Sequence, residues 1–156
     1  GRLKRNFQGY CVVPADDVLG LGISAIGDVA GAYVQNAKKL STYREALEAG
    51  RLPTERGVAL SADDRLRRHV IHSLMCNFAV DMRAVERRFD ISFADYFAED
   101  LALLIEHERT GMVTIEADVI RATELGQVFV RNLAMCFDTY LRRGERDDSK
   151  PFSRTV

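Results

Sequence analysis

Apolar residues recur at helical spacing through most of the chain beyond residue 60. They stand three or four positions apart in residues 61–77, again in 92–109, and again from residue 123 onward, which is the period of one face of an α-helix. Side-chain oxygens cap helix N-termini by accepting a free backbone N–H, and residues that carry them stand where these stretches begin: Ser61, Asp81, Ser92 and Thr123. The pattern predicts four helices, of which the one after Asp81 is short.

The large apolar side chains of these helices are expected to form a hydrophobic core. In the first long helix the core positions are Leu66, Val70, Ile71, Leu74, Met75 and Phe78. In the second they are Phe93, Tyr96, Phe97, Leu101, Leu104 and Ile105. In the last they are Leu125, Val128, Phe129, Leu133, Cys136, Phe137, Tyr140 and Leu141. An aromatic cluster is expected in this core, because aromatic rings contribute large buried areas: Phe93, Tyr96, Phe97, Phe129, Phe137 and Tyr140.

Residues 112–122 break the helical period. Apolar and polar positions alternate in 112–115 and in 119–122 around an acidic turn, which predicts a β-hairpin. The last helix should end at Arg142-Arg143-Gly144, since basic residues and a following glycine favour a helix C-terminus. Three helices, a hairpin and a further helix make a winged-helix-like arrangement, so the fold class is expected to be α+β, mainly α.

The first third of the chain lacks this helical periodicity and instead has signals of strands and turns. Residues 3–13 are rich in Phe, Tyr and Val, which predicts a strand, and Pro14 with two aspartates predicts a turn. Residues 18–26 are apolar and interrupted by Gly20 and Gly22. Two glycines would each cost about 1 kcal/mol in a helix, so a buried strand with a close backbone approach is favoured. A short helix in 42–49, ended by Gly50, and an extended segment in 57–60 follow.

The glycines also suggest a dinucleotide loop, because Gly20-x-Gly22-x-x-Ala25 matches that fingerprint formally. The residues that follow would make a weak helix, so a glycine-relieved strand facing a ligand is the better interpretation. The composition shifts near residues 56–61. We expect domain limits at 1–58 and 59–144, followed by a polar tail at 145–156.

Charge and cysteine content exclude several classes of function. The chain has 22 basic and 23 acidic residues, a net charge of −1, which gives no electrostatic reason to expect nucleic acid or an anionic membrane as partner. The helix in 92–109, which would face a DNA groove, is acidic. No apolar run approaches the roughly 18 residues of a membrane span, and no secretory signal is apparent. Three widely spaced cysteines predict free thiols in a cytoplasmic protein.

Two further clusters are expected to have no catalytic role. His69 and His72 lie one helical turn apart, but nothing nearby completes a metal site. A basic cluster is most simply a solvated helix face: Arg65, Arg67, Arg68, Arg83, Arg87 and Arg88. No nucleophile–base pair, phosphate loop or metal cluster is complete, so no catalytic residue and no metal ligand are assigned.

Five ordered segments of the chain resemble a known family. They are Arg5-Asn-Phe-Gln-Gly-Tyr10, Leu19-Gly-Leu-Gly-Ile-Ser-Ala-Ile26, Cys76-Asn-Phe78, Phe93-Ala-Asp-Tyr-Phe-Ala-Glu-Asp100 and Arg131-Asn-Leu-Ala-Met-Cys-Phe-Asp-Thr-Tyr-Leu141. Together they are similar to the C-terminal third of the oxygen-independent coproporphyrinogen III oxidases (dehydrogenases), which are radical S-adenosylmethionine enzymes. A haem-chaperone relative on the same scaffold usually has a Tyr-Trp pair near Gln8. This chain has no Trp, which favours the oxidase branch.

The resemblance implies an enzyme that oxidatively decarboxylates two propionates of coproporphyrinogen III, giving protoporphyrinogen IX in anaerobic haem biosynthesis. Residues 1–58 would be the C-terminal edge of a partial barrel, and the helical domain would cover the active site. Ile26 matches a position that contacts S-adenosylmethionine, and Phe7 and Gln8 match the strand that lines the same cavity. The full-length enzyme would hold S-adenosylmethionine and a 4Fe-4S cluster.

The cluster-binding pattern C-x3-C-x2-C is absent from these 156 residues. We therefore expect this region alone to be inactive and to bind neither cofactor. The expected partners are the porphyrinogen substrate and the missing N-terminal barrel, and a cut sheet edge is expected to favour self-association. The rival hypothesis is a winged-helix module that binds protein or nucleic acid and has no enzymatic parent.

Overall fold

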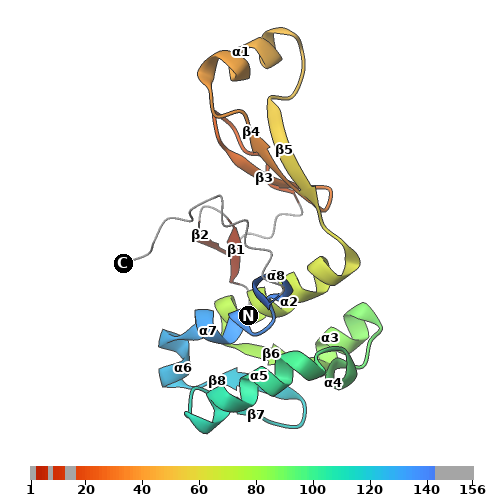
Figure 1. Cartoon of the computed structure of the whole chain (residues 1–156), viewed down its shortest axis with the longest axis vertical. Coiled ribbons are helices and arrows are strands. Elements are labelled where there is room, and N and C mark those ends of the chain that lie inside the picture. Colours follow the sequence, from red (N-terminus) through yellow and green to blue (C-terminus); the bar gives the residue numbers. More distant parts are fainter. Residues whose placement is uncertain (1–2, 7–8, 13–16, 143–156) are drawn as a thin grey trace. The chain divides into compact units, whose positions relative to one another are not determined.

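The computed structural model describes residues 3–6, 9–12 and 17–142. The chain divides into two compact units, residues 1–68 and 69–156, which are considered separately. Helices and short strands are mixed, and the strands form three small sheets (Figure 1). The predicted mixture of helices and short strands is confirmed.

The first unit contains two antiparallel sheets. Strand β1 (Lys4–Asn6) pairs with β2 (Gly9–Cys11). A second sheet has the order β3-β4-β5, made of β3 (Ile26–Val29), β4 (Ala32–Asn36) and β5 (Thr54–Ala59). Helix α1 (Leu40–Glu48) connects β4 to β5 beyond one end of this sheet (Figure 1).

Two sequence predictions for the first unit were wrong. A single strand was expected in residues 3–13, but the structure has two paired strands there. Gly9, the first residue of the second strand, has a φ of 128°, which residues other than glycine rarely adopt. The buried strand expected in residues 18–26 is a loop that contains only an isolated bridge from Val18 to Asp28. Gly22 and Ser24 have φ of 99° and 55°, so the backbone reverses instead of extending.

The helix starts of the second region are confirmed by their caps. The Ser61 hydroxyl accepts from the Asp64 N–H (3.1 Å), and the Asp64 carboxylate accepts from the Ser61 N–H (2.9 Å), a reciprocal pair that opens α2 (Ala62–Asn77). The division between the two units falls within α2, after Arg68. Asp81 caps α3 (Met82–Phe89) by accepting from the Ala84 N–H.

The helix predicted in residues 92–109 is interrupted at Phe97. Ser92 caps α4 (Phe93–Tyr96), and α5 (Ala98–Arg109) follows, with Gly111 beyond its end at a φ of 74°. The predicted hairpin is confirmed as β7 (Val113–Ile115) and β8 (Val119–Ala122). Strand β6 (Ala79–Asp81) adds to β8, which gives the sheet order β6-β8-β7. Helix α5 packs beside β7 (Figure 1).

The last predicted helix is broken into three. Thr123 caps α6 (Glu124–Val128), and α7 (Val130–Met135) and α8 (Thr139–Arg142) follow. The expected end at residues 143–144 and the expected tail at 145–156 lie outside the described residues. Gly126 packs so closely that a Cβ built on it would lie 1.7 Å from the Met112 carbonyl oxygen. A glycine was therefore required within this helix.

The core of the second unit contains part of the predicted aromatic cluster. Phe93, Phe97 and Phe137 are fully buried, with centroids 4.6 Å apart for the first pair and 5.4 Å for Phe97 with Phe137. The other three predicted aromatic members are exposed: Tyr96, Phe129 and Tyr140. Three aliphatic positions predicted in the core are also exposed, namely Ile105, Leu125 and Val128. In the last predicted helix, Leu133, Cys136 and Phe137 are buried as predicted, so the predicted inward face is confirmed at these three positions and wrong at the exposed ones.

Candidate functional site: the loop between Val18 and Asp28

Ile26 is the candidate site residue that the structure describes. It is the first residue of β3, pairs with Gln35 of β4, and has a half-buried side chain. Phe7 and Gln8, the other two candidates, lie outside the described residues. The structure therefore gives the surroundings of one of the three candidates.

The loop that leads into Ile26 is held by polar contacts from β4 and α1. The Asn36 side-chain amide donates to the carbonyl oxygens of Gly20 (2.8 Å) and Gly22 (3.0 Å). The Tyr43 hydroxyl accepts from the Gly22 N–H (3.2 Å). The backbone of residue 36 also donates to the Ala25 carbonyl (2.9 Å). Because Asn36 is buried, its side chain relies on these hydrogen bonds and not on water. They therefore fix the shape of a loop that lacks the regular backbone hydrogen bonds of a strand.

The glycines of this loop allow the chain to approach itself. A Cβ on Gly20 would lie 2.9 Å from the carbonyl carbon and oxygen of Ile26, and a Cβ on Gly27 would lie 2.9 Å from the Val18 oxygen. The close approach expected from the sequence is therefore present, but its partner is the protein's own backbone. Gly22 has open space around it. The helix that a dinucleotide fingerprint requires is absent from residues 26–36, which form β3 and β4.

Apolar side chains of the loop face solvent. Leu19 is 72% exposed and Leu21 is 89% exposed. Sequence reasoning placed both in a buried strand, because periodicity alone cannot tell a buried strand from an apolar loop.

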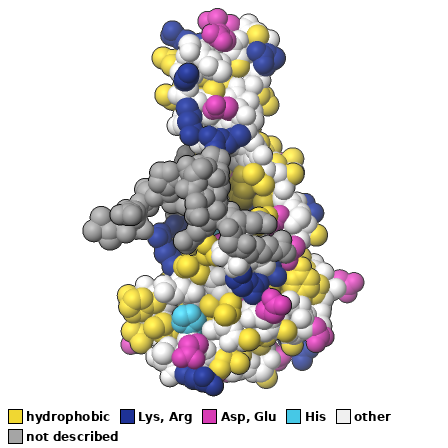
Figure 2. Space-filling model, viewed as in Figure 1, with side chains coloured by type: hydrophobic (Ala, Val, Ile, Leu, Met, Phe, Trp, Pro, Cys, Tyr) yellow, Lys and Arg dark blue, Asp and Glu magenta, His cyan; other side chains and the backbone are white. Residues whose placement is uncertain are grey.

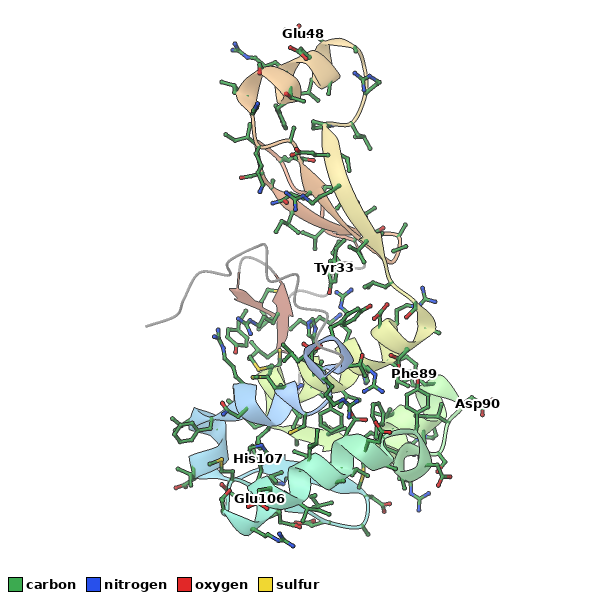
Figure 3. The ribbon with its side chains drawn as sticks, in the orientation of Figure 1. Tyr33, Glu48, Phe89, Asp90, Glu106 and His107 are labelled. Carbon is green, nitrogen blue, oxygen red and sulfur yellow. The ribbon has the colours of Figure 1, made fainter. Side chains whose placement is uncertain are left out.

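An ion pair and an aromatic ring anchor the other end of β3. The Arg68 guanidinium donates two hydrogen bonds to the Asp28 carboxylate, one of them 3.1 Å long. It also lies 5.1 Å from the centre of the ring of Tyr33, the residue labelled in Figure 3. Burial, opposed by Arg68 and reinforced by Asp28, raises the pKa of the Tyr33 hydroxyl. Burial is the largest single influence on Arg68 and would lower its pKa. The hydrogen bond to Asp28 together with the charges of Tyr33 and Asp28 outweighs it, so the pKa is raised and the guanidinium stays charged. Arg68 is thus a structural cation rather than part of an exposed basic face.

Other members of the predicted basic cluster are paired too. Arg67 contacts Asp63 (2.9 Å) and Arg83 contacts Asp118 (2.8 Å). His69 lies against the Phe89 ring, with centroids 5.4 Å apart. Phe89 lies at the end of α3 (Figure 3). Burial, with Arg88 as a second cause, lowers the pKa of His69.

Among residues 69–142, Asp100 is a buried carboxylate that sequence reasoning missed. Asp100 on α5 is 1% exposed and lies 2.9 Å from the Arg142 guanidinium on α8. The pair lies 42 positions apart in the sequence, so no local pattern could have indicated it. Burial, reinforced by Asp100, raises the pKa of Cys136, which keeps this buried thiol protonated.

The described residues do not fit an iron–sulfur cluster. Cys76 and Cys136 are buried and Cys11 is half-buried, and none of the three is in a disulfide within the described residues. Within the described part of the chain, no group of three or more His, Cys, Asp or Glu is placed to hold a metal ion. Among these same residues, no helix is long and apolar enough to cross a membrane.

Comparison with known proteins finds a family match for part of the chain. Residues 60–129 match the family described as HemN C-terminal domain. The family resemblance stated from the sequence is thereby confirmed, and the matched residues include α2 to α6 with the hairpin between them.

Whole-chain relatives extend the similarity beyond the HemN C-terminal domain. The chain is 44% identical over 156 residues to the oxygen-independent coproporphyrinogen III oxidase of Escherichia coli K12. That match covers 100% of this chain and 34% of the relative. It is 42% identical over 148 residues to the enzyme of the same name from Helicobacter pylori, covering 95% of this chain and 32% of the relative. It is also 38% identical over 157 residues to the enzyme of the same name from Thermostichus vulcanus, a match that covers 100% of this chain and 47% of that relative.

A solved structure agrees with these relatives. The chain superposes with a TM-score of 0.85 and 45% identity on a structure described as "Coproporphyrinogen III oxidase (HemN) from Escherichia coli is a Radical SAM enzyme". The match covers 89% of this chain and 32% of that one. The chain thus spans about a third of the length of most of the curated relatives named here.

Proposed function

We propose that this chain is the C-terminal part of an oxygen-independent coproporphyrinogen III oxidase. The whole enzyme would convert coproporphyrinogen III to protoporphyrinogen IX in the cytoplasm, by oxidative decarboxylation of two propionates. The observation that carries the proposal is similarity through both units, at 44% identity over all 156 residues. A winged-helix module without an enzymatic parent would resemble these enzymes in the second unit alone.

The radical chemistry would be supplied by S-adenosylmethionine and an iron–sulfur cluster bound mainly by the rest of the enzyme. The described residues contribute no set of cluster ligands. We expect the contribution of the first unit to be the wall of the S-adenosylmethionine cavity, with Ile26, Phe7 and Gln8 facing it. Two features support this role: Ile26 presents a half-buried apolar side chain, and buried Asn36 fixes the loop that precedes it.

The helical unit would close the active site of the whole enzyme. Excluding water from a site that generates a radical prevents side reactions of that intermediate. The unit has a fully buried core of its own, which suits a preformed cover.

Separated from its barrel, the 156-residue chain is expected to self-associate through the sheet of the first unit. Strand β5 is at the edge of that sheet and all six of its residues are exposed. Its unpaired backbone groups offer a template for another strand.

The test is an anaerobic activity assay of the longer protein that contains these 156 residues. After reconstitution with iron and sulfide, and with S-adenosylmethionine and a reductant, it should produce protoporphyrinogen IX. The 156-residue chain alone should produce none. Within the longer protein, Ile26→Asp should weaken S-adenosylmethionine binding at least tenfold, whereas Leu52→Asp, 79% exposed in the loop before β5, should leave it unchanged. A longer protein that binds haem but leaves the porphyrinogen intact would contradict the proposal.

A further inference from the structure

The outer face of α6 and α7 is apolar although it does not face the core. Its four large apolar side chains are 43–77% exposed: Leu125, Val128, Phe129 and Met135. The buried residues of the same segment also recur at helical spacing: Gly126, Val130, Leu133, Ala134 and Phe137. The two helices therefore have apolar side chains on two sides. Figure 2 shows hydrophobic side chains gathered at the edge of this unit where Figure 1 places α6.

A helix that is apolar on opposite sides is normally buried on both. Soluble proteins seldom leave several large apolar side chains together in water without a partner. Leu125 and Val128 lie on α6, Phe129 stands at the junction of the two helices, and Met135 ends α7. We call these four exposed side chains the outer face of α6–α7.

The polar residues along the outer face argue against an anionic ligand. The exposed polar positions in this stretch are Glu124, Gln127, Arg131 and Asn132, whose formal charges cancel. A porphyrinogen with several carboxylates would require several cations. Few charges together with Phe, Met and Leu are instead typical of the buried centre of a permanent protein interface.

The lengths of the relatives indicate which protein covers this face. About two thirds of the E. coli and H. pylori relatives, 66% and 68% of their lengths (100% minus 34% and 32%), lies outside the part that matches this chain. We propose that the outer face of α6–α7 packs against that remaining part of the enzyme's own polypeptide and joins the HemN C-terminal domain to it. The inference rests on the proposed function and adds the contact surface.

Hydroxyl-radical footprinting with mass spectrometry tests the contact directly, because Met, Phe and Leu side chains are oxidised when solvent reaches them. In the 156-residue chain Phe129 and Met135 should be labelled readily. In the longer protein their labelling should fall at least fivefold. Leu103 and Ile105, both 45% exposed on α5, provide the comparison, and their labelling should fall by much less. Equal labelling of Phe129 and Met135 in both proteins would overturn the proposal.

Variants separate this contact from folding and from activity. Val128→Glu should leave the thermal midpoint of the 156-residue chain unchanged, since the side chain is 77% exposed. In the longer protein the same change should restore labelling of Phe129 and Met135, whereas Ile105→Glu should not. Concentration-dependent protection of this face in the 156-residue chain, lost on Val128→Glu, would show that a second copy covers it and would also overturn the proposal. Because the readout is labelling, the contact can be refuted even in a longer protein that has the proposed activity, and supported in one that lacks it.

Discussion

Replacing Gly126 with alanine should destabilise the second unit strongly, against the usual trend for helices. Alanine normally favours a helix over glycine by about 1 kcal/mol. Here the new Cβ would lie 1.7 Å from the Met112 oxygen and 2.8 Å from the Met112 carbonyl carbon. Those are backbone atoms, so the overlap cannot be relieved by rotating a side chain.

The loss of stability caused by Gly126→Ala depends on how far the backbone around Met112 must shift. Real Cβ atoms essentially never lie within 3.0 Å of such a neighbour, so α6 and the residue before β7 must separate by more than 1 Å, and overpacking of that kind costs about 1–3 kcal/mol. The Met112 oxygen also accepts the Thr123 N–H at 3.1 Å. Losing that bond would add about 1 kcal/mol. After subtracting the gain of about 1 kcal/mol in helix propensity, the net loss should be about 1–3 kcal/mol.

The assay is urea unfolding followed by far-ultraviolet circular dichroism and by tyrosine fluorescence. Gly126→Ala should lower the transition midpoint of the helical unit. Gln127→Ala is the matched control, because residue 127 is exposed on the same helix and its substitution should change stability by no more than about 0.5 kcal/mol. If Gly126→Ala were as stable as the parent, the close packing between α6 and Met112 would be refuted.

Three further predictions follow from single contacts. Arg142→Met should cost about 2 kcal/mol by leaving buried Asp100 without its cation, with Arg131→Met, exposed on α7, as the neutral control in urea unfolding. Asn36→Ala should free the loop before Ile26, seen as at least tenfold faster hydrogen exchange of the Gly22 and Ser24 amides with exchange in β8 unchanged. Because the pKa of His69 is lowered in the folded state, the unfolded chain binds a proton at this residue at a higher pH than the folded chain does. The free energy of unfolding should therefore fall as the pH drops below about 6.5, and His69→Gln should make it less dependent on pH, as measured by unfolding at several pH values.

The sequence predicted those elements whose signals are local. Ser61, Asp81 and Thr123 cap helices where expected, because a capping bond joins residues only two or three positions apart. The hairpin in 113–122 was equally predictable, since its alternation and its turn lie within one short segment. The family resemblance rested on ordered motifs in both units and is confirmed by the relatives.

The sequence predictions that were wrong concern segments whose conformation depends on contacts between residues far apart in the chain. The loop before Ile26 takes its shape from Asn36, more than ten positions away, whereas its own apolar residues indicate a strand. The last helix turns Gly126 inward and Val128 outward because the Met112 carbonyl lies against the glycine. The apolar spacing of that helix fits either face, and only the tertiary contact decides between them.

The proposed activity is tested most directly by measuring the carbon dioxide released when the longer protein is incubated anaerobically with carboxyl-labelled coproporphyrinogen III, S-adenosylmethionine and a reductant. Two molecules of carbon dioxide are expected for each molecule of protoporphyrinogen IX formed, and no release is expected from the 156-residue chain alone. An intact, reconstituted longer protein that releases no carbon dioxide would contradict the proposed activity.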